Sequence, residues 1–229
     1  MREPVTTNIS APIIAIDGPS ASGKGTLARK VAAHLNYAYL DTGSLYRAVG
    51  YAILQAGGNP DNENHAAKAA KDVSASIASG NTEILANPAL KNDDIGQAAS
   101  KGASIPAVRA ALKQLQQNFI ANPPQPFIGA ILDGRDIGTV IAPNAPAKLF
   151  ITASTEIRAE RRFKELQSRD LSVTYDTVLA DLRERDARDE GRETSPSKPA
   201  SDAFIIDTSD MTPDEALEKA LDYIASRLT

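Results

Sequence analysis

The feature that most constrains the fold of this chain is a strand that leads through a glycine-rich turn into a helix. Ile13 to Ile16 form a continuous apolar run, which is typical of a strand buried on both faces. After the turn, Leu27, Val31 and Leu35 recur at helical spacing. Because a strand buried on both faces needs layers above and below it, this opening predicts an α/β fold.

Further apolar runs extend this pattern along the chain, each separated from the next by loop or helical stretches. They are 128–132, 149–152 and 204–206. Apolar side chains also recur at helical spacing in 108–119 and 217–228, and Thr212 to Glu215 have the sequence of a capping box before the second stretch. The alternation predicts a parallel β-sheet with helices on both sides.

One segment departs from this pattern. Residues 61–104 are rich in Ala, Asn, Asp and Ser, and the apolar stretches on either side of Gly80 predict a weak β-hairpin over 73–86. We therefore expect a small insertion at 61–104 between two parts of one core, 1–60 and 105–229.

Composition excludes several classes of protein. With 42% hydrophobic and 24% charged residues, the chain has the composition of a globular protein rather than a disordered one. The absence of cysteine and the presence of only two histidines exclude disulfides, thiolate metal sites and a histidine zinc site. A net charge of -4 argues against nucleic acid or anionic lipid as a partner held by bulk charge. The first apolar run is too short for a signal peptide or a membrane span, so we expect a cytoplasmic protein.

The turn after the first strand matches a phosphate-binding loop. It fits the first seven positions of the GxxxxGK[ST] pattern, with Gly25 and then Thr26 where the pattern has Ser or Thr directly after Lys24. Glycine lets backbone N–H groups turn inward around phosphate oxygens, and the helix start and Lys24 add positive charge. We expect Thr26 to approach a magnesium ion, directly or through water. The residues of the loop are Gly18, Pro19, Ser20, Ala21, Ser22, Gly23, Lys24, Gly25 and Thr26.

A phosphate-binding loop alone does not choose between a GTPase, an ATPase motor and a small-molecule kinase. The chain has no Asn-Lys-x-Asp guanine motif, and its Asp-x-x-Gly match at 93–96 lies in the insertion rather than after a buried strand. An ATPase motor needs a longer chain than 229 residues. These observations favour a small-molecule kinase.

Arginines gather between residues 158 and 192, where eight of the 14 in the chain lie. The nine basic residues of this stretch are balanced by nine acidic ones, so it lacks the unbalanced basic face that binds nucleic acid. Arg185, Arg188 and Arg192 share one helical face with Asp189. This spacing places like charges next to one another.

Two interpretations of the arginine face stay open. It is either a solvated face with the intrahelical pairs Asp181–Arg185 and Glu184–Arg188, or a site for a polyphosphate. Only the second explains why Arg188 and Arg192 stand one turn apart. A solvated face is at least as good an interpretation for the earlier set of Arg158, Arg161 and Arg162, and we expect 191–201 to form an exposed connection.

Four segments together resemble the bacterial cytidylate kinases, a subgroup of the nucleoside monophosphate kinases. They are GPSASGKGT at 18–26, DTGSLYR at 41–47, DGRDIGTVI at 133–141 and RERDARDEGR at 183–192. The resemblance extends from about Ile13 to Leu228. It implies a P-loop kinase core with a parallel β-sheet flanked by helices, a small monophosphate-binding insertion and a mobile lid at about 168–192.

The resemblance also implies the reaction, the substrates and the site residues. The γ-phosphoryl group of ATP would pass to CMP or dCMP with Mg²⁺ present, and we expect a monomer without a nucleic acid or membrane partner. Residues 18–26 would bind ATP, with Lys24, Arg185 and Arg188 acting in catalysis. The contacts to CMP would be Thr42 and Arg47 at the monophosphate, Ser100, Arg109 and Asp136 at cytosine, Arg135 and Arg192 at the phosphate, and Asp189 at the ribose.

The chemistry of such an acceptor asks for cations rather than for a base. A monophosphate with a second pKa near ~6 is mainly a dianion at neutral pH, and so is already a nucleophile. Asp17 would then orient the water shell of the metal or cap the turn. A kinase for a hydroxylated metabolite would instead need a carboxylate base such as Asp17 or Asp41, and a binding module regulated by nucleotides would need none.

Overall fold

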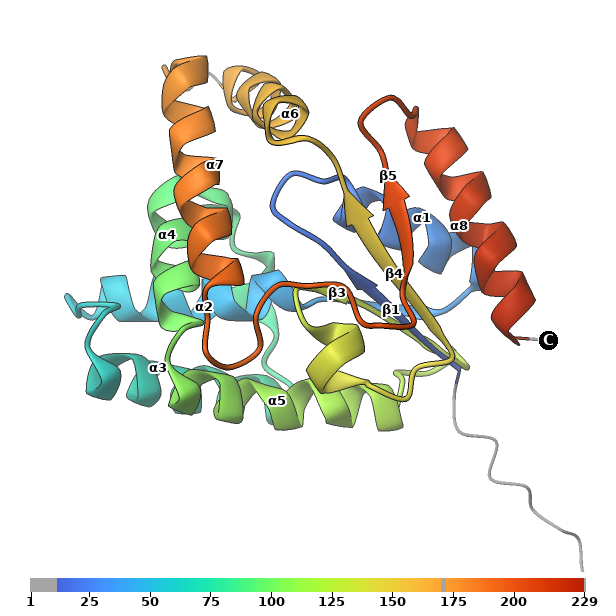
Figure 1. Ribbon diagram of the computed structural model, residues 1–229. Helices are drawn as coiled ribbons and strands as arrows, with labels where there is room; N and C mark the ends of the chain where they lie inside the picture. Colours follow the sequence, from blue (N-terminus) through green and yellow to red (C-terminus); the bar gives the residue numbers. More distant parts are fainter. Residues whose placement is uncertain (1–11, 170–171, 229) are drawn as a thin grey trace, which may run out of the picture.

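Five parallel strands form one sheet in the computed structural model, which describes residues 12–169 and 172–228 (Figure 1). The strands stand in the order β2-β3-β1-β4-β5. They are β1 (Ile13–Asp17), β2 (Ala38–Asp41), β3 (Ala130–Gly134), β4 (Ala147–Thr152) and β5 (Phe204–Asp207). The predicted parallel sheet is confirmed. The sequence pattern missed β2, whose apolar run, Ala-Tyr-Leu, is short and contains no β-branched residue.

The sheet is covered on both faces, as its apolar strands require. Ile14 and Ile16 pack with α1 (Lys24–Leu35) and α8 (Pro213–Leu228). Ala15 points to the opposite face, as alternation along a strand dictates, where Phe119 of α5 (Pro106–Ala121) packs. The expected capping box is present at the start of α8, because the Thr212 amide donates to Glu215 Oε2 (2.7 Å) and the Glu215 amide donates to Thr212 Oγ1 (3.3 Å).

The predicted β-hairpin in the insertion is wrong, because this stretch begins with a helix. Helix α3 (Glu63–Ala78) starts at Asn62, whose side chain accepts hydrogen bonds from the amides of Asn64 and His65. Its buried residues are Ala66, Ala70 and Val73, so the helical period dominates over the short alternation around Gly80, and this face packs against α2 (Thr42–Gln55) and α5. Two 3₁₀ turns, Glu83–Ala86 and Pro88–Lys91, lead to α4 (Asp93–Gly102).

Helices α6 (Thr155–Gln167) and α7 (Tyr175–Glu190) form a hairpin that rises from the sheet beside α4 (Figure 1). Buried Ala159 and Leu166 of α6 pack against Val178 and Leu182 of α7. The predicted lid segment, 168–192, therefore consists mainly of α7, while two of its residues, 170 and 171, lie outside the described part. Arg192 lies beyond the end of α7.

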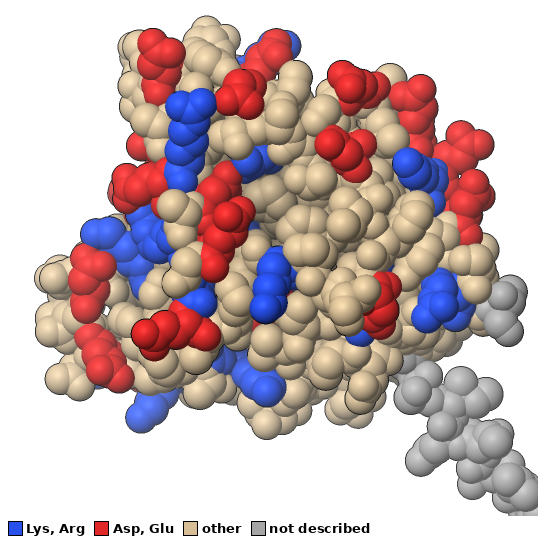
Figure 2. All heavy atoms as spheres, viewed as in Figure 1, with Lys and Arg blue, Asp and Glu red and all other residues tan. Residues whose placement is uncertain are grey.

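The surface in view mixes charges of both signs, and the described helices contain no candidate membrane span. Figure 2 shows Asp and Glu side chains interspersed with Lys and Arg over the face it presents. Among residues 12–169 and 172–228, no helix has the length and apolar character that a membrane span requires.

Candidate functional site

The carboxyl ends of the three neighbouring strands β2, β3 and β1 carry the side chains around which the site forms. Asp17 and Asp41 end β1 and β2, and Asp133 is the second-last residue of β3. In open α/β sheets, ligands bind outside this edge. The loop 18–23 leaves β1 here and connects it to α1.

The conformation of this loop requires glycine at two positions. A Cβ at Gly18 would lie 2.0 Å from the carbonyl oxygen of Ile151, and Gly23 has a φ of +88°. Helix α1 begins directly at Lys24, whose Nζ donates to the carbonyl of Pro19 (3.2 Å). The loop therefore closes on itself as a phosphate-binding loop does, with backbone near the start of a helix.

Lys24 lies in an environment that disfavours its charge. Burial and the nearby Arg135 lower the pKa of Lys24 from 10.5 to about 7, although Asp133 and Asp41 act in the opposite direction. Burial and Asp41 raise the pKa of Asp133 to about 6, and Tyr39 donates to its Oδ1 (3.1 Å). An arriving anion would restore the full charge of Lys24.

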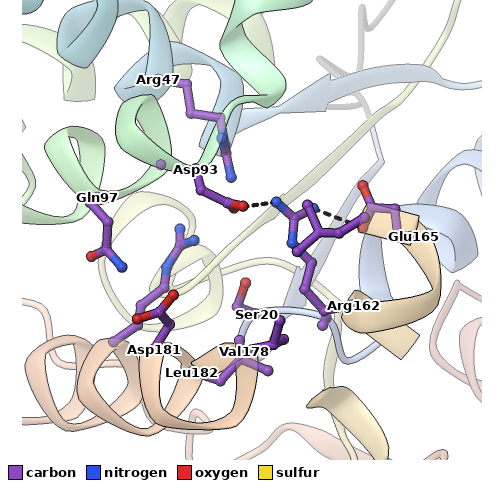
Figure 3. Close-up of a pocket in the computed structure, with 13 residues that line it drawn as sticks. Ser20, Arg47, Asp93, Gln97, Arg162, Glu165, Val178, Asp181 and Leu182 are labelled. Carbon is purple, nitrogen blue, oxygen red and sulfur yellow. Dashed lines mark hydrogen bonds and ion pairs between the residues drawn. The ribbon is translucent and has the colours of Figure 1, made fainter. Parts of the chain in front are cut away.

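Three arginines from three helices line a pocket beside the loop, which we call the arginine pocket (Figure 3). Arg47 of α2 donates to the carbonyls of Leu90 (2.6 Å) and Asn92 (3.2 Å). Arg162 of α6 pairs with Asp93 and with Glu165 (2.9 Å), as the dashed lines in Figure 3 mark.

The third member, Arg185 of α7, is half-buried, and its buried Nε has no hydrogen-bond partner in the described part of the chain. Burial and Arg135 lower the pKa of Arg185 to about 9. The loop residues Ser20 and Ala21 line the same pocket. The pocket is lined by three carboxylates as well as three arginines, but the charged groups that act on Arg185 are mainly other arginines, so Arg185 suits an anionic ligand.

A second pocket, which we call the paired pocket, contains seven of the eight residues predicted to contact CMP. They are Thr42, Ser100, Arg109, Arg135, Asp136, Asp189 and Arg192. The eighth, Arg47, lines the arginine pocket, and Arg185 lines both, so the two pockets are neighbours. The structure therefore brings together residues that are up to 150 positions apart in the sequence.

Three of the four arginines of the paired pocket form ion pairs with its two aspartates. Arg109 and Asp136 form an ion pair in which both side chains are about nine-tenths buried. Asp189 accepts hydrogen bonds from Ser100 Oγ (3.1 Å), from Arg135 Nε (3.0 Å) and from Arg192. Burial would raise the pKa of Asp189, but Arg135 and Arg192 hold it below the ordinary value.

A third pocket, the apolar pocket, lies on the other side of the loop and was not predicted from the sequence. Its lining includes Thr26, Leu27, Ile151, Met211 and Pro213. Arg161 also lines it and donates to Thr208 Oγ1 (3.0 Å) and to the carbonyl of Thr208 (2.6 Å). These residues come from α1, β4, α6, the turn before α8 and α8 itself, so the pattern of a single segment could not have revealed the pocket.

Arg188 stands apart from the other predicted catalytic residues. Its guanidinium pairs with Glu184, as the solvated interpretation expects, and donates to Gln97 Oε1 (3.2 Å). It lines neither the arginine pocket nor the paired pocket. Of the two expected intrahelical pairs, only this one appears among the ion pairs of the described residues, since none joins Asp181 to Arg185.

The solvated interpretation of the α6 arginines is wrong for Arg158. Its side chain is buried, pairs with Asp186 of α7 (2.7 Å), and donates to the carbonyl of Ser20 in the loop (3.2 Å). It also donates to the nearby carbonyl of Ala153 (3.0 Å) and to Thr155 Oγ1 (2.9 Å), but the ion pair and the contact to the loop join it to distant segments that the local sequence does not show.

Asp17 caps a turn, but this is the turn after β3 and not the turn after its own strand, which was the expected one. Its carboxylate accepts hydrogen bonds from the amides of Ile137 (2.8 Å) and Gly138 (2.7 Å). Burial raises the pKa of Asp17 to about 7 against the effect of these two donors. It holds the loop after β3 to the end of β1.

Comparisons with known proteins agree with this geometry. The family model for cytidylate kinase matches residues 14–226. A cytidylate kinase from Rhodospirillum rubrum is 53% identical over 215 residues, which are 94% of this chain and 98% of that protein. The cytidylate kinase of Paramagnetospirillum magneticum is 54% identical with the same coverage.

A solved structure adds evidence for the fold alone. The crystal structure of an uncharacterized protein from Eubacterium ventriosum superimposes with a TM-score of 0.52 at 15% identity, covering 94% of this chain and 99% of that one. Because the sequence match extends over nearly the whole length of both this chain and its relatives, the chain belongs to the cytidylate kinase family.

Proposed function

We propose that this protein transfers the γ-phosphoryl group of ATP to CMP or dCMP, giving ADP and CDP or dCDP. The observation that carries the proposal is the paired pocket, which gathers seven residues predicted to bind CMP directly beside the loop of Lys24. Arg185 lines both neighbouring pockets, where the two nucleotides would meet.

ATP would bind with its phosphates on the loop 18–26 and its base in the apolar pocket. The backbone amides at the start of α1 suit phosphate oxygens. The apolar side chains of Leu27, Ile151 and Met211 suit an adenine ring, which has large apolar faces. The guanidinium of Arg161 is held at this pocket by Thr208.

Cytosine would be read by Asp136 and Arg109, with Ser100 in support. An ionised Asp136 only accepts hydrogen bonds, so it suits the amino group of cytosine and disfavours the carbonyl that uracil has at the same position. Arg109 can donate to N3 or to the carbonyl at position 2. Their ion pair orients both groups before the base arrives.

The remaining residues of this set would bind the ribose and the phosphate. Asp189 already accepts from three donors, and a carboxylate has about four acceptor positions, so one is left for a ribose hydroxyl. Arg47, Arg135 and Arg192 would bind the monophosphate. Thr42, whose hydroxyl donates to the carbonyl of Asp133 (2.7 Å), would offer its oxygen atom as an acceptor.

The chemical task is to bring two anions together in line and to exclude water. Lys24 and Arg185 would neutralise the charge that develops between the phosphates, and Arg162 would join them once phosphate competes with Asp93. Arg188 would act only after a rearrangement, since it is held by Glu184 and Gln97.

Mg²⁺ fits the residues at the loop as a partner of ATP. No group of three His, Asp or Glu side chains that could hold a metal ion exists in 12–169 and 172–228, but Mg²⁺ commonly uses one or two carboxylates together with phosphate oxygens. Asp133 and Asp41, which act on the charge of Lys24, would hold it directly or through water, whereas Thr26, the predicted metal contact, lines the apolar pocket on the other side of the loop. When bound, it supplies positive charge to the phosphates.

Two segments of the chain would have roles of their own in this reaction. Residues 61–104 would act as the monophosphate-binding insertion and 168–192 as a lid that closes over the nucleotides. Because one chain lines all three pockets, we propose that it acts as a monomer. We also propose that it works in the cytoplasm.

An assay of ADP formation with a panel of acceptors tests this function. We expect CMP and dCMP to give the highest kcat/KM, with UMP well below them. A hydroxylated metabolite that outperforms every monophosphate would replace the proposal with a kinase that uses a carboxylate base. Nucleotide binding without turnover on any acceptor would indicate a regulated binding module.

A further inference from the structure

The turn that presents Asp136 is capped from another strand. Residues Ile137–Ile141 form a single π-helical turn, and Asp136 occupies its N-cap position. An Asp at this position normally accepts hydrogen bonds from the first free amides of its own helix. Asp136 makes no such bond.

Asp17 takes the place of the missing cap. Its two carboxylate oxygens accept from the amides of Ile137 and Gly138, the first two residues of the turn, at 2.8 and 2.7 Å. All of these groups are buried. The side chain of Asp136 instead pairs with Arg109 and lines the paired pocket.

We infer that Asp17 is a positioning residue for the choice of base: it occupies the amides of Ile137 and Gly138 and so leaves the carboxylate of Asp136 for Arg109 and cytosine. The inference rests on the proposed role of Asp136. Without Asp17, two buried amides would lack an acceptor, and the nearest carboxylate in the sequence is that of Asp136. Capping its own turn would draw Asp136 away from the base.

Asp17 also connects the segment proposed to bind ATP with the segment proposed to read the base. It is the last residue of β1, and the phosphate-binding loop begins at Gly18. The strands β1 and β3 separate just after the pair Asp17 and Gly134, one toward the loop and the other toward Asp136. A single carboxylate therefore fixes the position of the base-reading turn relative to the ATP loop.

The test measures the ratio of kcat/KM for CMP to kcat/KM for UMP, because the fraction of active enzyme cancels from this ratio. In Asp17→Asn, one side-chain NH₂ faces an amide that needs an acceptor, so we expect the ratio to fall by about five- to tenfold. The control is Thr139→Val, since the Thr139 hydroxyl on the same turn has no hydrogen-bond partner in the described chain, and we expect its ratio to be unchanged.

A double variant separates the inference from the proposed function. Asp136→Asn should lower the ratio at least tenfold, and adding Asp17→Asn to it should cause no further fall if Asp17 acts through Asp136. Hydrogen exchange of the Ile137 and Gly138 amides should be faster in Asp17→Asn. An unchanged ratio in Asp17→Asn, with a reduced ratio in Asp136→Asn, would overturn the inference and leave the proposed function standing.

Two further outcomes complete the test. An unchanged ratio in Asp136→Asn would overturn the proposed role of Asp136, and the selectivity role of Asp17 with it. If Asp17→Asn does not fold, Gly138→Ala disturbs the same contact, because a Cβ there would lie 3.4 Å from Asp17 Oδ2 and 3.2 Å from Lys148 Cδ. A smaller fall in the ratio supports the inference, and no fall overturns it.

Discussion

The arginine pocket and the paired pocket lie side by side and share Arg185, yet Arg185 is held differently from the arginines that form ion pairs in each pocket. In the paired pocket, Arg109 and Arg135 each have a buried carboxylate as partner. In the arginine pocket, Arg185 has a lowered pKa and an Nε without a partner in the described chain. Lys24, close by, also has a lowered pKa.

The difference separates two tasks of a binding site. Charges that are paired within the protein are held in fixed directions, which suits the reading of a base. Cations that lack partners gain most from an arriving polyanion, which suits the stabilisation of transferring phosphate. Removing Arg185 should therefore affect activity and stability differently from removing the ion-paired Arg109.

The largest effect should come from Lys24→Ala. We expect phosphoryl transfer to fall by about 10³-fold or more, because Lys24 supplies charge where it develops between the phosphates. The protein should remain folded, since a buried ammonium with a lowered pKa contributes little to stability. Single-turnover transfer and thermal unfolding measure both quantities, and transfer within threefold of the wild type would remove Lys24 from the mechanism.

A pair of matched variants tests the contrast directly. Arg185→Gln should lower kcat about 10²-fold while leaving the free energy of unfolding unchanged or higher. Arg109→Gln should raise the KM for CMP and lower the free energy of unfolding by about 3 to 5 kcal/mol, because it leaves Asp136 buried without its cation. Chemical denaturation measures the free energy of unfolding of both variants. An equal loss of stability in the two would contradict the distinction between Arg185 and the ion-paired Arg109.

The proposed lid should respond to the occupation of both pockets. We expect slower hydrogen exchange in 172–190 when a bisubstrate analogue binds, because the arginines of α7 then gain an anionic partner. ATP or CMP alone should give a smaller effect. Exchange that is the same with and without the analogue would contradict a lid at this position.

The smallest expected effect is the uptake of a proton on ATP binding. Free Lys24 has a pKa of about 7, and the phosphates raise it, so at pH 8 it changes from mostly neutral to charged and takes up close to one proton. Affinity should accordingly fall as the pH rises through 7. Calorimetry in buffers of different ionisation enthalpy measures the uptake, and Lys24→Met serves as the control. Equal uptake in both proteins would assign the proton to another group.

Local patterns predicted those parts of the molecule that depend on neighbours in the sequence. The continuous run Ile13–Ile16, the glycines of the loop and the capping box at Thr212 each contain their own structural reason: burial on both faces, backbone freedom and a short-range hydrogen bond. Strand β2 escaped prediction because pairing with β3, rather than its own four residues, makes it a strand.

The CMP contacts were predicted from the family resemblance, because hydrophobic periodicity identifies helices and strands but no ligand contacts. Motif residues such as Thr42, Asp136 and Asp189 are far apart in the chain, and the structure brings them into one pocket. Arg158, for which a solvated position was favoured, and Asp133, which was given no role, pair with residues of other elements that the local sequence does not show.

The sequence by itself determined the phosphate-binding loop, the parallel α/β architecture and the family, because these follow from local geometry and from motifs. Only the tertiary structure decided which arginines of the described chain form ion pairs, and that Asp17 caps the turn of Asp136. The physical reason is that the state of a buried charge or amide depends on the groups that surround it in space, and folding brings those groups from distant segments.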